Sequence, residues 1–358
     1  MGFTSEHFTS EQQLHNEVNR NRLYEQETNR LFDLLANAGY QYEDCSTIAP
    51  LTSKINRFKE EQNALILAHH YMTPDITFGI ADYAEDALGL IRRAEESSAD
   101  TIVMCSVASL AECVKISCPD KKVLCPEKLA GCSVSDSITV DDVYRLKEKY
   151  PGVPTIAYVT TSAAVKAVSD YIVTSANVRD LIQALPDKQV IFYPDHSISS
   201  SLNAEFSDKE IIGWNGTCVV HDNYSVDQVM HFRQQHPDAH VLFHSEVNPD
   251  LYLHGELHGG TKAMLEYVDK HPEVNSFFMV TECGLSDQLR TKYPEKKFIG
   301  TCSLCPFMKM ISLDNTLLSL DEKNSWKYEI NFSSRVLEGA RNAYLKTEYV
   351  LGSKRHGC

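Results

Sequence analysis

Short apolar runs that end in polar residues recur along the chain and predict buried β-strands. Runs of four to eight apolar residues without alternation are typical of strands covered on both faces of a parallel sheet. One set reads LILAHHY, TIAYVTT and VLFHSEV, at residues 65–71, 155–161 and 241–247. A second set reads TIVMCSV, VIFYPDH and FFMVTEC, at residues 101–107, 190–196 and 277–283.

The strands of the first set begin at 65, 155 and 241, so they recur after 90 and then 86 residues. Solenoid repeats have periods of about 20–50 residues, which is too short for this pattern. Helical patterns such as residues 82–97 and 225–236 lie between the runs. Alternating strands and helices indicate parallel sheets with covered faces. The sequence therefore predicts an α/β fold of three homologous three-layer units, each with a short parallel sheet.

The repeat also divides the chain. We expect a helical N-terminal extension, three α/β units around a pseudo-threefold axis, and a C-terminal helical segment that packs on the body. Ligands of parallel sheets bind at the carboxyl ends of the strands, which such an axis would bring to one centre. The predicted boundaries are 1–60, 61–150, 151–236, 237–312 and 313–358.

Composition narrows the function classes. The 358 residues are 43% hydrophobic, with no apolar run long enough for a bilayer and no signal-peptide pattern, so we expect a cytoplasmic protein. The net charge of −15 argues against a nucleic-acid partner. In such an acidic protein, a small anionic carboxylate or phosphate substrate would need a local anion-binding site, such as a helix N-terminus or a metal.

Three of the eleven cysteines share the period of the strands. Cys132, Cys218 and Cys305 are separated by 86 (218 − 132) and 87 (305 − 218) residues, so each unit could supply one thiolate to the axis. Thiolates select zinc, Cu(I) or an iron–sulfur cluster. A structural zinc would take Cys302 as its fourth ligand, whereas a [4Fe–4S] cluster on three cysteines would keep one iron open. We interpret six others as packing residues: Cys45, Cys105, Cys113, Cys118, Cys125 and Cys283.

A second periodic set has acid–base chemistry. Residues i and i+2 of a strand lie on one face, so each unit projects a pair of side chains toward the axis. Imidazole, phenol and carboxylate groups transfer protons in catalysis. The pairs are His69 with Tyr71, Tyr158 with Thr160, and His244 with Glu246.

Hydroxyl-rich turns precede several predicted helices. Such residues cap helices, and free N–H groups there also bind carboxylate or phosphate. We interpret Lys166, inside one of these helices, as a solvated charge. The candidate anion-binding residues are Thr161, Ser162, Ser175 and Thr261.

Taken together, the motifs over residues 60–312 resemble the quinolinate synthase family. They are AHHY (68–71), ADYAEDALGL (81–90), AGCSVSDS (130–137), YVTTSAAVKA (158–167), SDYIVTSAN (169–177), WNGTCVVH (214–221), HSE (244–246), GGTKAMLEYV (259–268) and CSLCPFM (302–308). The resemblance implies three α/β units around a [4Fe–4S] cluster. It also implies condensation of iminoaspartate with dihydroxyacetone phosphate, with loss of phosphate and water, for NAD biosynthesis.

Residue roles carry over position by position. The resemblance implies that Cys132, Cys218 and Cys305 hold the cluster and that Cys302 does not. The implied catalytic residues are His69, Tyr71, Tyr158, His244 and Glu246. The implied substrate-binding residues are Thr160, Ser175, His221, Thr261 and Lys262.

The departures from the family pattern fall on groups that would hold the substrate. Ala87 and Ala108 stand at a family serine and histidine, Thr160 at an asparagine, and Gly260 and Lys262 at two serines. Hydrogen bonds to a charged group contribute about 1.5–3 kcal/mol each, so such changes can alter substrate choice. Two alternatives therefore stay open: a divergent paralogue that acts on another small carboxylic acid, and a non-catalytic metal-binding structural or sensor protein.

Overall fold

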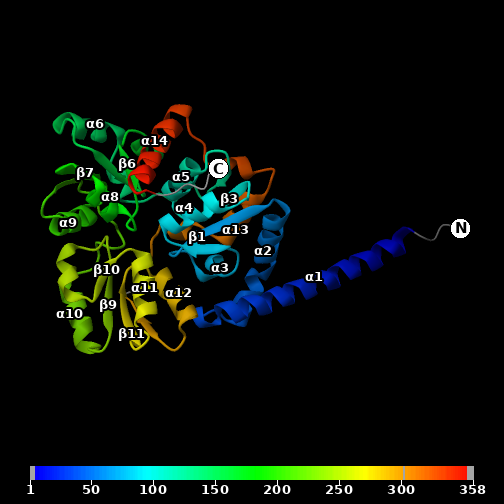
Figure 1. Ribbon diagram of the computed structural model, residues 1–358. Helices are drawn as coiled ribbons and strands as arrows, with labels where there is room; N and C mark the ends of the chain where they lie inside the picture. Colours follow the sequence, from blue (N-terminus) through cyan, green and yellow to red (C-terminus); the bar gives the residue numbers. More distant parts are fainter. Residues whose placement is uncertain (1–4, 301–302, 353–358) are drawn as a thin grey trace.

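The computed structural model describes residues 5–300 and 303–352 and contains three four-stranded sheets, all parallel. The strand order is the same in each: β2-β1-β3-β4, β6-β5-β7-β8 and β10-β9-β11-β12. Figure 1 shows the three sheets with their helices as neighbouring lobes. The prediction of an α/β fold with three parallel units is confirmed.

Each lobe uses the same succession of elements, in which a helix follows each strand. In the first lobe these are β1 (Ala64–His69), α3 (Pro74–Thr77), β2 (Tyr83–Glu85), α4 (Ala87–Glu96), β3 (Thr101–Cys105), α5 (Ala108–Ser117), β4 (Lys122–Leu124), η2 (Ser135–Ser137) and α6 (Val140–Lys149). In the second they are β5 (Thr155–Tyr158), α7 (Ala163–Ala167), β6 (Tyr171–Val173), α8 (Val178–Ala184), β7 (Gln189–Tyr193), α9 (His196–Glu205), β8 (Glu210–Gly213) and α10 (Val226–Gln235).

The third lobe repeats the succession with short 3-10 turns in two places. Its elements are β9 (His240–His244), η3 (Pro249–His254), β10 (Leu257–Gly259), α11 (Thr261–Lys270), β11 (Ser276–Val280), α12 (Cys283–Lys292), β12 (Lys297–Ile299), η4 (Met308–Met310) and α13 (Leu313–Leu320).

Matching capping boxes begin the last helix of each succession. Thr139, Ser225 and Ser312 each accept a hydrogen bond from the backbone N–H three residues later, and that residue's side chain bonds back. This arrangement satisfies two otherwise unpaired helix donors. Each cap lies seven residues after a predicted ligand cysteine (139 − 132, 225 − 218 and 312 − 305). The caps therefore fix where each cysteine loop ends.

These three helices close the lobes into a ring, because each packs against the next sheet. Val143 of α6 lies in one apolar cluster with Ile191 of β7. Phe232 of α10 stacks on Phe278 of β11 with centroids 3.8 Å apart. Thr316 of α13 contacts Cys105 of β3. Because each lobe's last helix packs against the next lobe's sheet, the three lobes are joined. The loops after their last strands therefore face one another.

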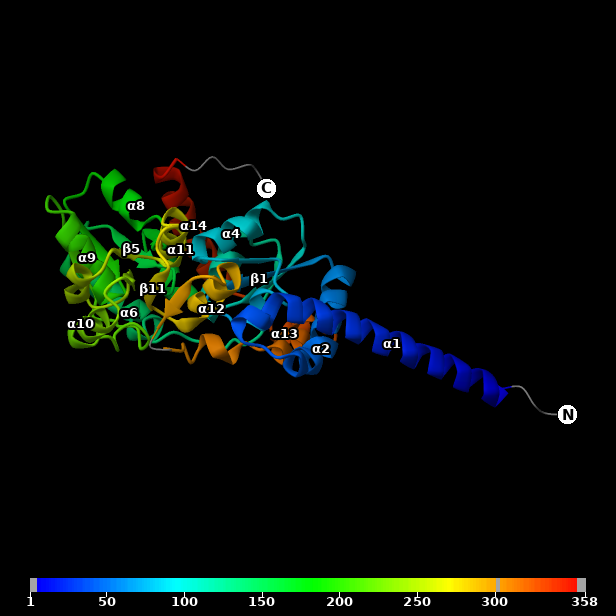
Figure 2. The same ribbon diagram turned by 90° about the horizontal axis from the view of Figure 1, so that it is seen from below.

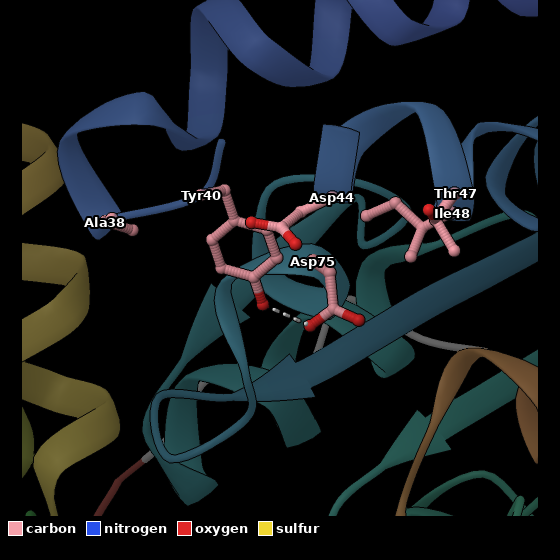
Figure 3. Close-up of a pocket in the computed structure, with 7 residues that line it drawn as sticks. Ala38, Tyr40, Asp44, Thr47, Ile48 and Asp75 are labelled. Atoms are coloured by element: carbon pink, nitrogen blue, oxygen red, sulfur yellow. Dashed lines mark hydrogen bonds between the residues drawn. The ribbon is translucent and has the colours of Figure 1, made fainter. Parts of the chain in front are cut away.

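The N-terminal extension, α1 (Ser5–Leu35), η1 (Ala36–Ala38) and α2 (Tyr42–Glu61), docks on the first lobe. Leu31, Leu35 and Ile55 are completely buried. The Tyr40 hydroxyl donates to Asp75 Oδ1 over 3.2 Å beside a surface hollow that contains none of the predicted site residues (Figure 3). Both ribbon views show the first turns of α1 projecting away from the body (Figures 1 and 2).

The C-terminal segment returns across the first two lobes. Ile330 donates its N–H to the Val123 carbonyl over 2.8 Å, so the chain after η5 (Ser325–Lys327) runs antiparallel beside β4. Helix α14 (Ser334–Val350) then packs between the lobes, where Thr347 accepts the Ile172 N–H over 3.0 Å. The exact boundaries predicted for the five segments stay a prediction. Among the described helices, none is long and apolar enough to span a membrane.

Candidate functional site

The predicted acid–base residues lie at equivalent strand ends. His69, Tyr158 and His244 are the last residues of β1, β5 and β9, the first strand of each sheet. All three side chains are buried. Their equivalence follows from the repeat, because each strand ends where its apolar run gives way to polar residues.

Hydrogen bonds join residues of all three lobes in a buried polar cluster. The His221 Nδ1 lies 3.1 Å from Glu246 Oε2 and 3.3 Å from the Cys218 sulfur, and its Nε2 lies 3.1 Å from Thr281 Oγ1. The Tyr71 hydroxyl lies 2.8 Å from the same Thr281 oxygen. Thr281 therefore links the first lobe's tyrosine to the second lobe's histidine.

The aromatic rings complete this cluster. The His221 and His244 rings stack with centroids 4.2 Å apart, and Tyr71 lies 4.7 Å from His69 and 6.2 Å from His244. Tyr158 is buried at the end of β5, where burial raises the pKa of its hydroxyl well above the ordinary value and the nearby Glu246 adds to the rise. The structure thus gathers all five predicted catalytic residues at the centre.

The pKa values of the clustered groups differ, so one carboxylate is ionised while the neighbouring imidazole rings are neutral. Burial would raise the pKa of Glu246, but the hydrogen bond from His221 and the nearby imidazoles lower it to about 2. Burial lowers the pKa of His69 and of His244 to about 3. Burial raises the pKa of Tyr71 well above its ordinary value. At neutral pH the site therefore holds an ionised Glu246 beside neutral imidazoles and a protonated phenol.

The two lowered histidine pKa values predict sensitivity to acid. Between about pH 3 and 6.5 these two histidines are protonated in the unfolded chain but neutral in the folded protein. The free energy of unfolding therefore decreases as the pH falls through this window and is unaffected by these rings above pH 6.5. Each ring contributes about 1.4 kcal/mol per pH unit in this window. We expect His244→Gln to flatten the pH dependence of the free energy of unfolding, measured with urea on metal-free protein. The exposed His231→Gln is the control, and an unchanged slope for His244→Gln would contradict the assignment.

The loops that carry the three cysteines contact one another. The Ser133 hydroxyl donates to the Thr217 carbonyl over 3.1 Å and accepts the Val219 N–H over 3.2 Å. The Ser303 hydroxyl donates to the Val220 carbonyl over 3.3 Å. The loops around Cys132, Cys218 and Cys305 are therefore adjacent, with the second-lobe loop between the other two.

The thiols themselves influence one another. Burial raises the pKa of Cys132 to about 12, and the charge of Cys305 adds to this rise. Burial, Glu246 and Cys132 raise the pKa of Cys218 well above its ordinary value. None of the nine cysteines that the structure describes is in a disulfide. Close, unpaired thiols that resist ionisation alone are suited to a strongly positive partner.

The spacing of the donor atoms bears on the kind of metal. A zinc–thiolate bond is about 2.3 Å, so two thiolates on one ion lie at most about 4.6 Å apart. In the described part of the chain, one group of potential ligands lies within 4.8 Å: Cys218, His221 and Glu246. Of the three periodic cysteines, Cys218 alone belongs to this group. Cys302, the proposed fourth zinc ligand, lies outside the described residues.

Two of the predicted substrate-binding residues, Ser175 and Thr261, lie where the second and third lobes meet, and His221 lies in the polar cluster described above. Gly260 approaches Ser175 so closely that a Cβ at position 260 would lie 2.4 Å from the Ser175 hydroxyl. Thr261 is buried at the start of α11, and Lys262 beside it is exposed. Thr160 Oγ1 is buried and has no hydrogen-bond partner among the described residues. The Thr160 hydroxyl is therefore available to a ligand.

The remaining hydroxyl candidates have structural partners. Thr161 donates to the Tyr158 carbonyl over 2.9 Å, and Ser162 caps α7. The interpretation of Lys166 as a solvated charge is wrong. It is completely buried, and its ammonium donates to the carbonyls of Thr161 and Ser109. Short helix α7 turns this side chain inward, between the first two lobes.

Sequence reasoning missed three polar residues close to the site: Thr281, Glu282 and Asp195. Asp195 is buried after β7, where it caps α9, and burial raises the pKa of its carboxyl group well above the ordinary value. Glu282 is completely buried after β11. The repeat carried a signal for both, because Ser106, Asp195 and Glu282 are separated by 89 (195 − 106) and 87 (282 − 195) residues.

Comparison with known proteins identifies the family of the chain. The model of the family described as quinolinate synthetase A protein matches residues 53–347. Quinolinate synthase of Xylella fastidiosa (strain Temecula1) is 39% identical over 290 residues, which cover 81% of this chain and 84% of the relative. Quinolinate synthase 2 of Mesorhizobium japonicum is 42% identical over 266 residues, covering 74% and 81%. The chain belongs to the quinolinate synthase family.

Proposed function

We propose that this chain is a quinolinate synthase of the cytoplasm, which condenses iminoaspartate with dihydroxyacetone phosphate and releases phosphate and water. The relatives named quinolinate synthase support the reaction. The observation that carries it at the site is the chain of hydrogen bonds from Glu246 through His221 and Thr281 to Tyr71. These bonds support the proposal because a base and an acid beside Cys218 are what the reaction would need.

Cys132, Cys218 and Cys305 would hold a [4Fe–4S] cluster. The donor set fits this group, because it offers one thiol from each lobe on adjoining loops and no fourth periodic cysteine. When bound, the cluster supplies a Lewis acid at the iron that no cysteine binds. Binding by only three cysteines therefore leaves one iron open, as the proposed reaction requires.

The chain's own residues would move the protons. Glu246 is ionised at neutral pH and can accept a proton from the substrate. Tyr71 keeps its proton and can donate it to a departing oxygen, and His221 lies between the two. His69 and His244 are neutral, so they can orient substrate as hydrogen-bond donors without adding charge.

Substrate anions would bind where α11 begins. The N-terminus of this ten-residue helix carries no side-chain cap, and Thr261 and Ser175 lie beside it. Backbone N–H groups at such an end stabilise a carboxylate or phosphate. Lys262 adds an exposed cation nearby. These local donors would offset the chain's overall charge of −15.

A second candidate is a paralogue that uses the same centre on a different small carboxylic acid. The unpartnered Thr160 hydroxyl and the absence of side chains at Gly260 favour it, because both change the lining on the substrate side. A non-catalytic metal-binding role is less well supported by the site. It gives no reason for the buried bonds among Glu246, His221 and Tyr71.

The deciding experiment is an anaerobic assay on protein with verified iron and sulfide content. Dihydroxyacetone phosphate and freshly generated iminoaspartate are supplied, and quinolinate is measured. We expect quinolinate from loaded protein and none after the iron is removed with a chelator. Loaded protein that makes no quinolinate would overturn this function and direct the search to other small acids. A Cys302→Ser protein that loses its metal would instead favour a four-ligand structural site.

A further inference from the structure

An ion pair between a buried glutamate and a partly buried lysine lies between the end of β11 and the loop that carries Cys305. Glu282 is completely buried, and Lys309 Nζ lies 2.9 Å from its Oε1. The same oxygen accepts the Cys305 N–H over 3.3 Å, and Oε2 accepts the Gly284 N–H over 2.6 Å. One carboxylate therefore ties a predicted cluster ligand to the end of a central strand.

Lys309 extends this connection to the first lobe. Its ammonium group also donates to the backbone carbonyl of Tyr71. Gly284 is part of the same contact, because a Cβ there would lie 3.0 Å from backbone atoms of Tyr71. The pair thus touches the backbone of Cys305 in the third lobe and that of Tyr71 in the first.

The repeat shows that the fold does not require this pair. Residues four positions after the cysteines are Asp136, Asp222 and Lys309, and each donates its N–H to the carbonyl of its cysteine, over 2.9, 2.9 and 3.1 Å. That backbone turn is common to all three lobes. A lysine side chain at this position occurs only in the third.

The position equivalent to Glu282, the partner of Lys309, also differs among the three lobes. Ser106 and Asp195 correspond to Glu282, so the second lobe has Asp195 and Asp222 where the third has an acid and a base. In the second lobe burial, Glu246 and Asp222 raise the pKa of Asp195, whereas in the third lobe Glu282 and Lys309 form an ion pair. Two lobes reach the same backbone geometry without a cation. The ion pair therefore serves something other than the repeated fold.

We infer that Glu282 and Lys309 are positioning residues that hold Cys305 and Tyr71 in fixed relation across the boundary between the third and first lobes. This inference rests on the proposed function, in which Cys305 binds the cluster and Tyr71 donates a proton. Burying Glu282 and most of Lys309 has a desolvation cost that offsets much of the pair's attraction, so stability alone is a weak reason for the pair. Partners behind a ligand typically change metal affinity or activity 10–100-fold when removed.

The test compares Lys309→Met with Lys309→Arg and with Lys296→Met. Lys296 is a matched control, because it is a buried lysine of the same lobe whose ammonium donates to the carbonyls of His271, Pro272 and Val274 before β11. Each protein is loaded anaerobically. The rate of iron release to a chelator and the kcat and KM for quinolinate formation are then measured.

We expect Lys309→Met to release iron at least about tenfold faster and to lose at least about tenfold in kcat with little change in KM. Lys309→Arg keeps the cation and should recover most of both, and Lys296→Met should match the wild type. Glu282→Gln combined with Lys309→Met should be no worse than Lys309→Met alone, because the two act as one unit. This double variant also removes the unpaired buried charge that could impair folding of the single variant.

The outcomes separate this inference from the proposed function. Lys309→Met that equals the wild type in iron release and kcat, or Lys296→Met that shows the same losses, would overturn the positioning role. A wild-type chain that binds iron and sulfide but makes no quinolinate would overturn the proposed function, and the iron-release comparison would still decide the role of the pair. A wild-type chain that takes up no cluster would overturn both.

Discussion

Cys218→Ala is expected to abolish cluster binding and to reduce quinolinate formation at least about a hundredfold, while the protein stays folded. The expected size follows from the position of Cys218 itself, since changes behind a ligand already produce losses of 10–100-fold. Its loop lies between the loops of Cys132 and Cys305 and contacts both. Alanine here would leave only Cys132 and Cys305, two of the three proposed ligands, which is too few to retain the cluster.

Cys105→Ala is the matched control, because Cys105 is completely buried in β3 and its sulfur contacts the Thr316 hydroxyl. It should lose up to a few kcal/mol of stability through a small cavity and keep the cluster and the activity. Iron and sulfide per chain, the visible spectrum and kcat distinguish the two variants. A Cys218→Ala protein with full iron and sulfide content would exclude Cys218 as a ligand.

The repeated part of the fold could be predicted because burial and chemistry share one period. Strands β1, β5 and β9 lie in the first set of apolar runs and end at His69, Tyr158 and His244. A buried parallel strand must be apolar, and its carboxyl end is where polar side chains become useful. The change from apolar to polar residues therefore located the strand end and the candidate site residues together.

Contacts between lobes could not be predicted in this way. Lys166 has the sequence context of an exposed helix residue, and only the packing of α5 against α7 gives its ammonium the carbonyls that make burial tolerable. Helix α6 follows the first sheet in sequence but packs against the second. No local pattern encodes which neighbouring sheet a helix covers, because either sheet would bury the same apolar face.

The hydrogen bonds between lobes at the centre could not be predicted from the sequence either. Thr281 follows an apolar run, as many threonines do, and its role arises because Tyr71 and His221 approach it from two other lobes. Lys309 was equally ordinary in sequence. The difference between Lys309 and its equivalents Asp136 and Asp222 becomes informative only when the three cysteine turns are compared. Comparing the three equivalent turns therefore singles out Lys309, which the repeat pattern alone does not.

Glu246→Gln should reduce kcat by about 10²–10⁴-fold and leave the cluster content unchanged, the range expected when a general base is removed. The pKa of Glu246, about 2, keeps the group ionised throughout the neutral range, and glutamine preserves its size and one hydrogen-bond acceptor for His221. KM should change little, because the anion site proposed above is near Ser175 and Thr261 and does not include Glu246. Glu246→Asp keeps the charge on a shorter side chain and should recover part of the rate.

Glu256→Gln supplies the control for this change. Glu256 lies in the same lobe and accepts the Val241 N–H at the opposite end of the sheet, away from the cysteine loops. Its variant should keep the wild-type kcat even if some stability is lost. A Glu246→Gln protein within threefold of the wild-type kcat would show that the proton leaves by another group. Of the neighbouring side chains, His221 would then be the first to test, since it bridges the Cys218 sulfur and the Thr281 hydroxyl.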